Sequence, residues 1–133
     1  MKKRIALFLT VCVISLAFTV PAAAIEIAPM ANNYTSAKAS LTIVKGEATA
    51  IGKLYGFDGI TTKATVHLYL QQYRNGEWSD YDDWLESNAG YDCVVVKTVS
   101  VPKGYKYRAK ASCYAYAGSK SEHVTKYSAE VEY

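Results

Sequence analysis

Histidine and tryptophan are scarce in this chain, with two of each, and cysteine occurs three times. A structural zinc site needs four ligands, and His67 and His123 would have to recruit two more. The sequence also lacks a nucleophile elbow, a zinc-protease helix and a phosphate-binding loop. It therefore predicts no catalytic residue, no metal and no cofactor, and a protein that is not an enzyme.

An excess of charge of one sign is also missing once the N-terminus is set aside. Three basic side chains lie within residues 1–4, residues 5–20 form an uncharged apolar run, and Pro21 precedes three alanines that end at Ala24. This is the pattern of a secretory signal peptide, and the apolar run is short for a membrane span of about 20 residues. We expect cleavage after Ala24, secretion from the cell and no membrane attachment afterwards.

Removal of residues 1–24 takes away the whole formal charge of +3, so residues 25–133 are formally neutral. The basic pI of 8.7 belongs to the precursor and does not indicate a nucleic-acid partner. Acidic residues gather in 58–92 and basic residues in 97–126. Such a division is typical of complementary solvated strands.

Alternation of apolar and polar residues is the main structural signal. It predicts strands over residues 37–44, 48–55, 60–73, 78–85 and 122–131. No segment has the period of an amphipathic helix, and the 12 tyrosines favour strands.

A long β-hairpin is expected over residues 91–116, with its turn at Val101–Tyr105, where Pro102 and Gly104 suit a three-residue loop. This register places Cys93 directly opposite Cys113 and predicts a disulfide between them in a secreted chain. The alternative is a pair of buried free thiols that pack as small hydrophobic groups.

Together these elements make seven short strands. They predict an all-β fold, a two-sheet antiparallel sandwich of the immunoglobulin or fibronectin type. Residues 25–36 are expected to be a flexible lead, and residues 37–133 a single domain.

Aromatic residues around the predicted turn at Asn75-Gly76 are the best candidates for a binding surface. Tyr69 and Tyr73 share one face of their strand and lie near Trp78 across the turn. In a regular strand Trp78 and Trp84 would share one face with Asp80 and Asp82, whereas Tyr81 and Leu85 would share the other. Neither face is consistently apolar, which predicts a β-bulge between the two tryptophans. Trp84 is expected in the core, whereas Trp78 could be either a core residue or part of a flat binding platform.

Acidic residues between Asp80 and Asp92 could suggest calcium. Calcium needs six to eight oxygen ligands from a turning loop, whereas neighbours on a strand point to opposite faces. The pattern instead indicates an acidic strand edge that discourages pairing with other chains.

Short motifs in a fixed order also carry a resemblance. They are Ala39-x-Leu41-x-Ile43, Gly46-x-Ala48-x-Ala50, Leu70-Gln71, Gly76-x-Trp78 with Trp84, Lys103-Gly104-Tyr105-x-Tyr107-Arg108, Gly118-Ser119-x-x-Glu122 and Tyr127-Ser128. On these motifs the chain resembles a family of short secreted proteins of Gram-positive bacteria, a domain of unknown function. The resemblance implies export and a β-sandwich, and it implies no activity.

The sequence thus predicts a secreted binding module with an extracellular protein or glycan as its ligand. One alternative is a structural or matrix protein that self-associates through an exposed final strand, Thr125–Tyr133. Another is a secreted toxin or bacteriocin-like effector. An exposed aromatic cluster would favour the binding module, and a long uncovered final strand would favour self-association.

Overall fold

The computed structural model describes residues 32–133, which form eight β-strands and no helix, and so contain no helix able to cross a membrane. The predicted signal peptide and residues 25–31 of the predicted lead lie outside the described residues. The first strand begins at Tyr34, so the last part of that lead belongs to the sandwich.

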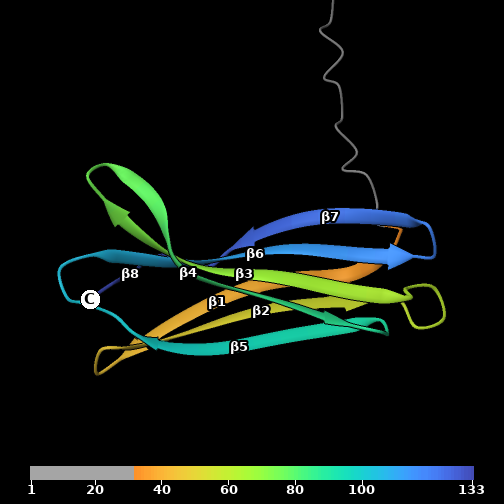
Figure 1. Cartoon of the computed structure of the whole chain (residues 1–133), viewed down its shortest axis with the longest axis horizontal. Helices are drawn as coiled ribbons and strands as arrows, with labels where there is room; N and C mark the ends of the chain where they lie inside the picture. Colours follow the sequence, from red (N-terminus) through yellow and green to blue (C-terminus); the bar gives the residue numbers. More distant parts are fainter. Residues whose placement is uncertain (1–31) are drawn as a thin grey trace, which may run out of the picture.

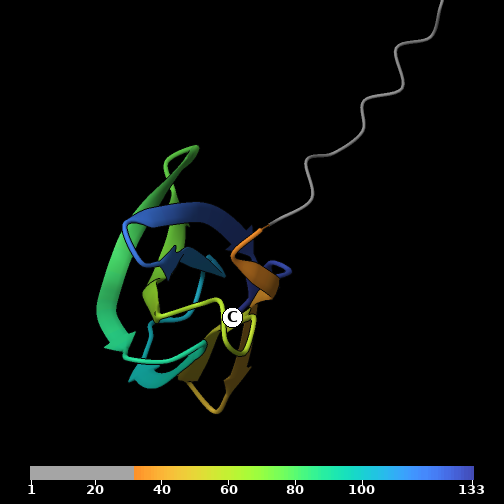
Figure 2. The ribbon, with the colours of Figure 1, turned by 90° about the vertical axis from the view of Figure 1, so that its right-hand side faces the viewer.

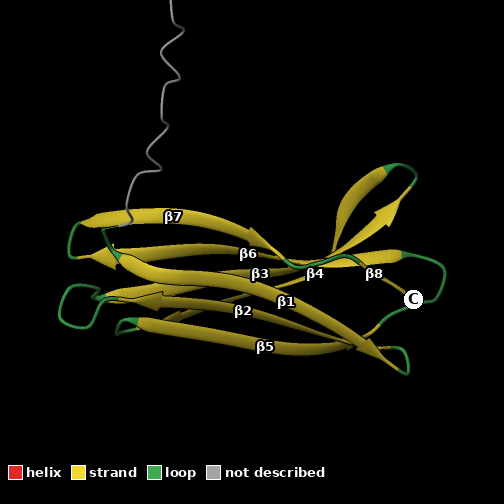
Figure 3. Cartoon of the chain, turned by 180° about the vertical axis from the view of Figure 1, so that it is seen from behind, coloured by secondary structure: helices red, strands yellow, loops and turns green. Residues whose placement is uncertain are grey.

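Two antiparallel sheets pack face to face (Figure 1). The strands are β1 (Tyr34–Val44), β2 (Glu47–Gly56), β3 (Lys63–Arg74), β4 (Glu77–Asn88), β5 (Asp92–Ser100), β6 (Lys106–Ala117), β7 (Lys120–Tyr127) and β8 (Val131–Glu132). The smaller sheet has the order β1-β2-β5 and the larger one β4-β3-β6-β7, with β8 paired to the start of β6. Figure 3 shows both layers from behind. The predicted all-β sandwich is confirmed.

The core lies between the sheets and contains every second side chain of the central strands. On β6 the buried residues alternate strictly, as do those of β2 and β5 in the opposite sheet. On β3 the core residues also alternate, but outward-facing Thr65 and Gln71 are buried as well. Gly52 is part of this inner face: a methyl group there would lie 2.9 Å from Cγ1 of Val66 and 3.3 Å from Cβ of Ala111. Glycine at this position therefore lets the two sheets approach each other closely.

The β3–β4 hairpin turns at Asn75-Gly76, as predicted. Both residues have positive φ, 53° and 81°, which suits the turn that matches the twist of paired strands. Its register shifts where Leu70 and Gln71 face Asp82 and Asp80, so Tyr81 is an extra residue on β4. This is the predicted bulge, and the hairpin tip beyond it projects from the sandwich (Figure 2).

The predicted hairpin over residues 91–116 is wrong. Its two arms exist as β5 and β6, but β5 pairs with β2 and β6 pairs with β3. The chain between Val101 and Tyr105 crosses from one sheet to the other. Two strands that face each other across a sandwich bury alternate residues as regularly as two strands side by side, so the period alone could not separate these arrangements.

The disulfide predicted from that hairpin is absent. Cys93 on β5 and Cys113 on β6 are free, buried thiols in opposite sheets. Burial raises the pKa of both thiols, that of Cys113 to about 12, with further contributions from Glu86 at Cys93 and from Cys93 at Cys113. They pack as small core residues, which was the alternative considered for them.

We expect both thiols to be unreactive in the native protein at pH 8. The thiolate is the reactive form, and a pKa near 12 leaves almost none of it at Cys113. Ellman's reagent should react with two thiols of residues 25–133 only after the chain is unfolded in denaturant. A non-reduced peptide that joins Cys93 to Cys113, or rapid labelling of the folded protein, would contradict this expectation.

Candidate functional site

Polar and aromatic side chains alternate with core residues along β3 and β6, so they share the outer face of the larger sheet. The bulge at Tyr81 gives the two tryptophans opposite directions. Trp84 is opposite Leu68 and packs against the core, as expected, whereas Trp78 is opposite Tyr73 and half-buried on the outer face. The open question about Trp78 is thus answered by its position next to the hairpin tip.

Tyr73 and Trp78 form an aromatic pair across the β3–β4 hairpin. Their ring centroids are 5.2 Å apart with planes inclined by 57°, and Tyr73 is 38% exposed. Tyr69, the third predicted site residue, lies on the same face but takes part in a different set of contacts. The structure therefore brings two of the three predicted residues together.

A row of three cations on β6 runs beside these rings. Lys106, Arg108 and Lys110 lie at alternate positions, opposite Tyr73, Gln71 and Tyr69 of β3. The Nζ atoms of Lys106 and Lys110 lie 5.9 Å and 5.0 Å from the ring centroids of Tyr73 and Tyr69. Both distances are within the range of cation–π attraction.

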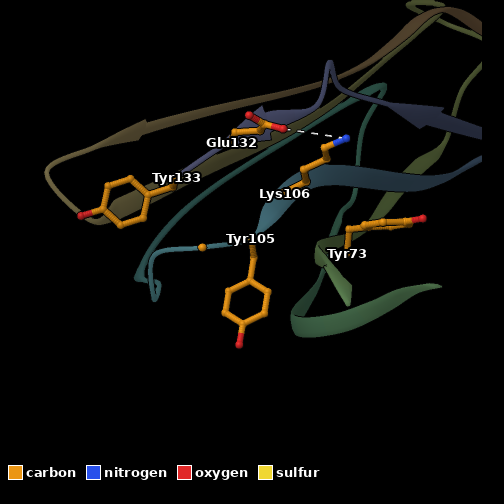
Figure 4. Close-up of a pocket in the computed structure, with 6 residues that line it drawn as sticks. Tyr73, Tyr105, Lys106, Glu132 and Tyr133 are labelled. Atoms are coloured by element: carbon orange, nitrogen blue, oxygen red, sulfur yellow. Dashed lines mark ion pairs between the residues drawn. The ribbon is translucent and has the colours of Figure 1, made fainter. Parts of the chain in front are cut away.

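Two hollows that share Tyr73 and Lys106 form a groove at the end of this face. The first, of about 510 Å³, is lined by Tyr73, Gly104, Tyr105, Lys106, Glu132 and Tyr133 (Figure 4). The second, of about 300 Å³, has Tyr73 and Lys106 in common with it and adds Trp78 and Glu130. We refer to the two together as the end groove.

The C-terminal segment supplies the far wall of the end groove. The backbone of Tyr133 donates to the carbonyl of Tyr105 at 3.1 Å, and the amide of Tyr105 donates to the carbonyl of Tyr133 at 3.3 Å. Glu132 lies opposite Lys106, with Nζ and Oε1 3.8 Å apart. These contacts fix four groove residues that come from two distant parts of the chain.

Tyr105 and Tyr133, which line the end groove, each have a basic side chain close to the ring. The guanidinium of Arg74 lies 5.6 Å from the ring centroid of Tyr105, and Nζ of Lys103 lies 5.5 Å from that of Tyr133. The end groove is therefore lined by flat rings with positive charges beside them.

Both histidines lie on the outer face, away from the end groove. His67 contacts Asp83 through Nε2 at 2.6 Å and the hydroxyl of Tyr69 through Nδ1 at 2.8 Å. Burial, followed by Asp80 and Asp83, raises the pKa of Tyr69 and keeps its phenol neutral. His67, Asp83 and Tyr69 are thus hydrogen-bonded to one another on the outer face of the sheet. Neither histidine lines the end groove.

His123 has a similar environment. Its Nε2 atom is 2.7 Å from the hydroxyl of Ser112, and its ring stacks on Tyr114 with centroids 4.4 Å apart. Residues 32–133 contain no group of three or more histidine, cysteine or acidic side chains that could hold a metal ion.

The sequence did not reveal Tyr105, Lys106, Glu130, Glu132 and Tyr133 as site residues. Lys106 was expected only to face water, and Tyr105 was placed in the turn of a hairpin that does not form. The C-terminal wall depends on β8 returning to pair with β6. A two-residue strand after a break has no alternation by which it could be recognised.

Comparisons with known proteins give little further guidance. No family model matches the chain, and no curated protein is detectably similar to it in sequence. The solution structure of R. palustris CsgH is a distant likeness, with 11% identity and a TM-score of 0.44 over 69% of this chain and 88% of that one. A likeness of this kind bears on neither ligand nor activity.

Proposed function

We propose that this protein is a secreted, non-enzymatic module that binds an extracellular glycan or protein in the end groove. The observation that carries this proposal is the gathering of four aromatic rings around Lys106. Tyr73 and Trp78 come from the β3–β4 hairpin, Tyr105 from the crossover before β6, and Tyr133 from the C-terminal segment.

The composition of the end groove suits binding. Tyrosine and tryptophan offer rigid flat area and a hydrogen-bonding edge, and they lose little conformational freedom when a ligand covers them. Lys106 and the carboxylates of Glu130 and Glu132 add a donor and two acceptors beside the rings. A concave site with apolar walls and a few convergent polar groups is the usual form of a ligand site.

Self-association through the last strand has less support. The segment predicted as one long edge is broken after Tyr127, where the amide of Ser128 donates to the carbonyl of Ala109 and its hydroxyl accepts from the amide of Ala109. Chain pairing resumes only at β8, which has two residues. A short, interrupted edge is a poor template for another chain.

Secretion, and membership of the secreted Gram-positive family that the motifs resemble, are part of the same proposal. No contact among residues 32–133 favours a secreted toxin or bacteriocin-like effector over a binding module. An extracellular location suits a binding module with neutral net charge after loss of the leader.

Replacement of Trp78 by alanine is expected to abolish binding while the protein remains folded. Trp78 is half-buried and contacts Tyr73 and Arg108 rather than the core, so its loss should lower the free energy of unfolding by only about 1 kcal/mol. Binding can be measured by pull-down of the secreted form on Gram-positive cell-envelope fractions and by glycan array. Folding can be followed by thermal denaturation.

Leu85→Ala is the matched control because Leu85 lies on the same strand, is 64% exposed and does not line the end groove. It should leave binding and melting temperature unchanged. Unimpaired binding by folded Trp78→Ala would refute the end groove as the ligand site. A loss of about 3–5 kcal/mol would show that Trp78 acts as a core residue.

A further inference from the structure

Arg108 is held more rigidly than any other cation of the outer face. Its guanidinium carbon lies 4.3 Å from the ring centroid of Trp78 and 4.4 Å from that of Tyr127. Its Nε donates to Oε1 of Gln71 at 2.8 Å, and the amide of Gln71 donates in turn to Asp80 at 2.9 Å. Two rings and one hydrogen bond therefore fix the plane of the guanidinium before any ligand arrives.

The terminal amino groups of Arg108 remain available. No acceptor among residues 32–133 bonds to its Nη atoms, and the only buried side-chain polar atom without a partner there is Oδ1 of Asp92. The Nη atoms are thus not fully buried, and the same holds for Nζ of Lys110. A planar guanidinium with free Nη groups is the preferred receptor for a carboxylate, which it binds through two parallel hydrogen bonds.

Among residues 32–133, no neighbouring carboxylate forms a direct ion pair with these two cations. Asp83 bonds to His67, Asp80 accepts from Gln71, and Glu132 pairs with Lys106. Within the described part of the chain, no carboxylate lies within ion-pair distance of Arg108 or Lys110. A positive row therefore leads from the end groove along β6, with alternate residues about 7 Å apart.

We propose that the ligand of the end groove is an acidic polysaccharide, an inference that rests on the proposed function. A sugar carboxylate binds the Nη edge of Arg108, another carboxylate pairs with Lys110, and a sugar ring stacks on Tyr73. A neutral glycan would use the rings and leave both cations without a partner. An acidic peptide would use the cations without repeating flat faces for the rings.

Isothermal titration of the secreted form against polysaccharides of matched length tests the inference. The acidic probes are polygalacturonate, alginate and hyaluronate, the neutral probe is dextran, and the peptide probe is polyglutamate. We expect at least one acidic polysaccharide to bind about tenfold or more tightly than dextran and polyglutamate. Raising the salt concentration from 50 to 500 mM should weaken that binding several-fold, because screening acts on exposed ion pairs.

Four variants localise the effect. Arg108→Gln should weaken binding of the acidic polysaccharide by about tenfold or more, and Lys110→Gln by a few-fold. Arg108→Lys keeps the charge but lacks the planar fork, so it should recover only part of the affinity. Lys38→Gln makes the same charge change at an exposed position of β1, on the other sheet, and should have no effect. Circular dichroism verifies that each variant is folded.

The outcomes separate this inference from the proposed function. The proposal of an acidic polysaccharide would be overturned if dextran or polyglutamate bound equally well, or if no acidic polysaccharide bound. Full affinity in folded Arg108→Gln would also overturn it. Cell-envelope binding that is abolished by Trp78→Ala would still support the end groove in each of these cases. Envelope binding that survives Trp78→Ala would refute the end groove itself.

Discussion

Tyr107→Ala is expected to lower the free energy of unfolding by about 3–5 kcal/mol, and Tyr107→Phe by about 1–3 kcal/mol. Tyr107 is fully buried near the start of β6. Its hydroxyl donates to the carbonyl of Pro102 at 2.6 Å and accepts from the amide of Gln72 at 3.1 Å. Alanine would leave a large cavity, whereas phenylalanine would leave the buried amide of Gln72 and the part-buried carbonyl of Pro102 without their partner.

The hydroxyl of Tyr107 ties a strand to the crossover that precedes it, which is the arrangement called a tyrosine corner in β-sandwiches. The same crossover carries Tyr105 and leads directly into Lys106, so it holds two groove residues in place. Tyr107→Phe should therefore also weaken ligand binding, by loosening the crossover rather than by removing a contact. Burial raises the pKa of Tyr107, so the neutral phenol persists at physiological pH.

Urea denaturation measures the free energy of unfolding of Tyr107→Ala and Tyr107→Phe, and Tyr105→Phe is the control. Tyr105 is half-buried, and its hydroxyl has no hydrogen-bond partner among the described residues. Loss of that hydroxyl should change the free energy of unfolding by less than about 0.5 kcal/mol. Equal losses in Tyr105→Phe and Tyr107→Phe would show that the Pro102 contact contributes nothing specific.

Much of the fold could be predicted because most of its elements have a signal in the local sequence. Alternation located the strands, Asn75-Gly76 located a hairpin, and the mismatched parity of Trp78 and Trp84 located a bulge. Each of these signals depends on a few consecutive residues. The pairing of β5 with β2 depends instead on a choice between sheets, which alternation does not encode.

The candidate site divides in the same way. Tyr73 and Trp78 could be identified because one hairpin brings them together, and a hairpin can be read from its turn. Tyr105 and Tyr133 meet them only after a crossover between sheets and the return of β8. Arg108 belongs to the basic block that was expected on a solvated strand, but its two ring partners come from β4 and β7, on opposite sides of β6.

Gly56→Ala is expected to lower the free energy of unfolding by about 3 kcal/mol or more. Gly56 ends β2, and its amide donates to the carbonyl of Tyr91 at 2.6 Å. A methyl group on Gly56 would lie 2.5 Å from that same carbonyl oxygen and would overlap the hydroxyl of Thr61. Because one obstacle is backbone, no change of rotamer can make room.

Thr61 adds to the cost because it joins three segments. Its buried hydroxyl accepts from the amide of Phe57 at 2.8 Å and donates to the carbonyl of Asn33. Displacing it would disturb the entry to β1, the loop after β2 and the start of β3 together. A small shift at Gly56 is therefore expected to break hydrogen bonds between loop residues that adjoin both sheets.

Gly52→Ala provides the matched comparison on the same strand. The added methyl at Gly52 would approach only side chains, of which the nearest is Val66 at 2.9 Å. Side chains of the core can shift by a few tenths of an ångström, so the expected loss is about 1–2 kcal/mol. Urea denaturation of the two variants ranks them, and a larger loss for Gly52→Ala would mean that the junction at Gly56 is softer than its hydrogen bonds indicate.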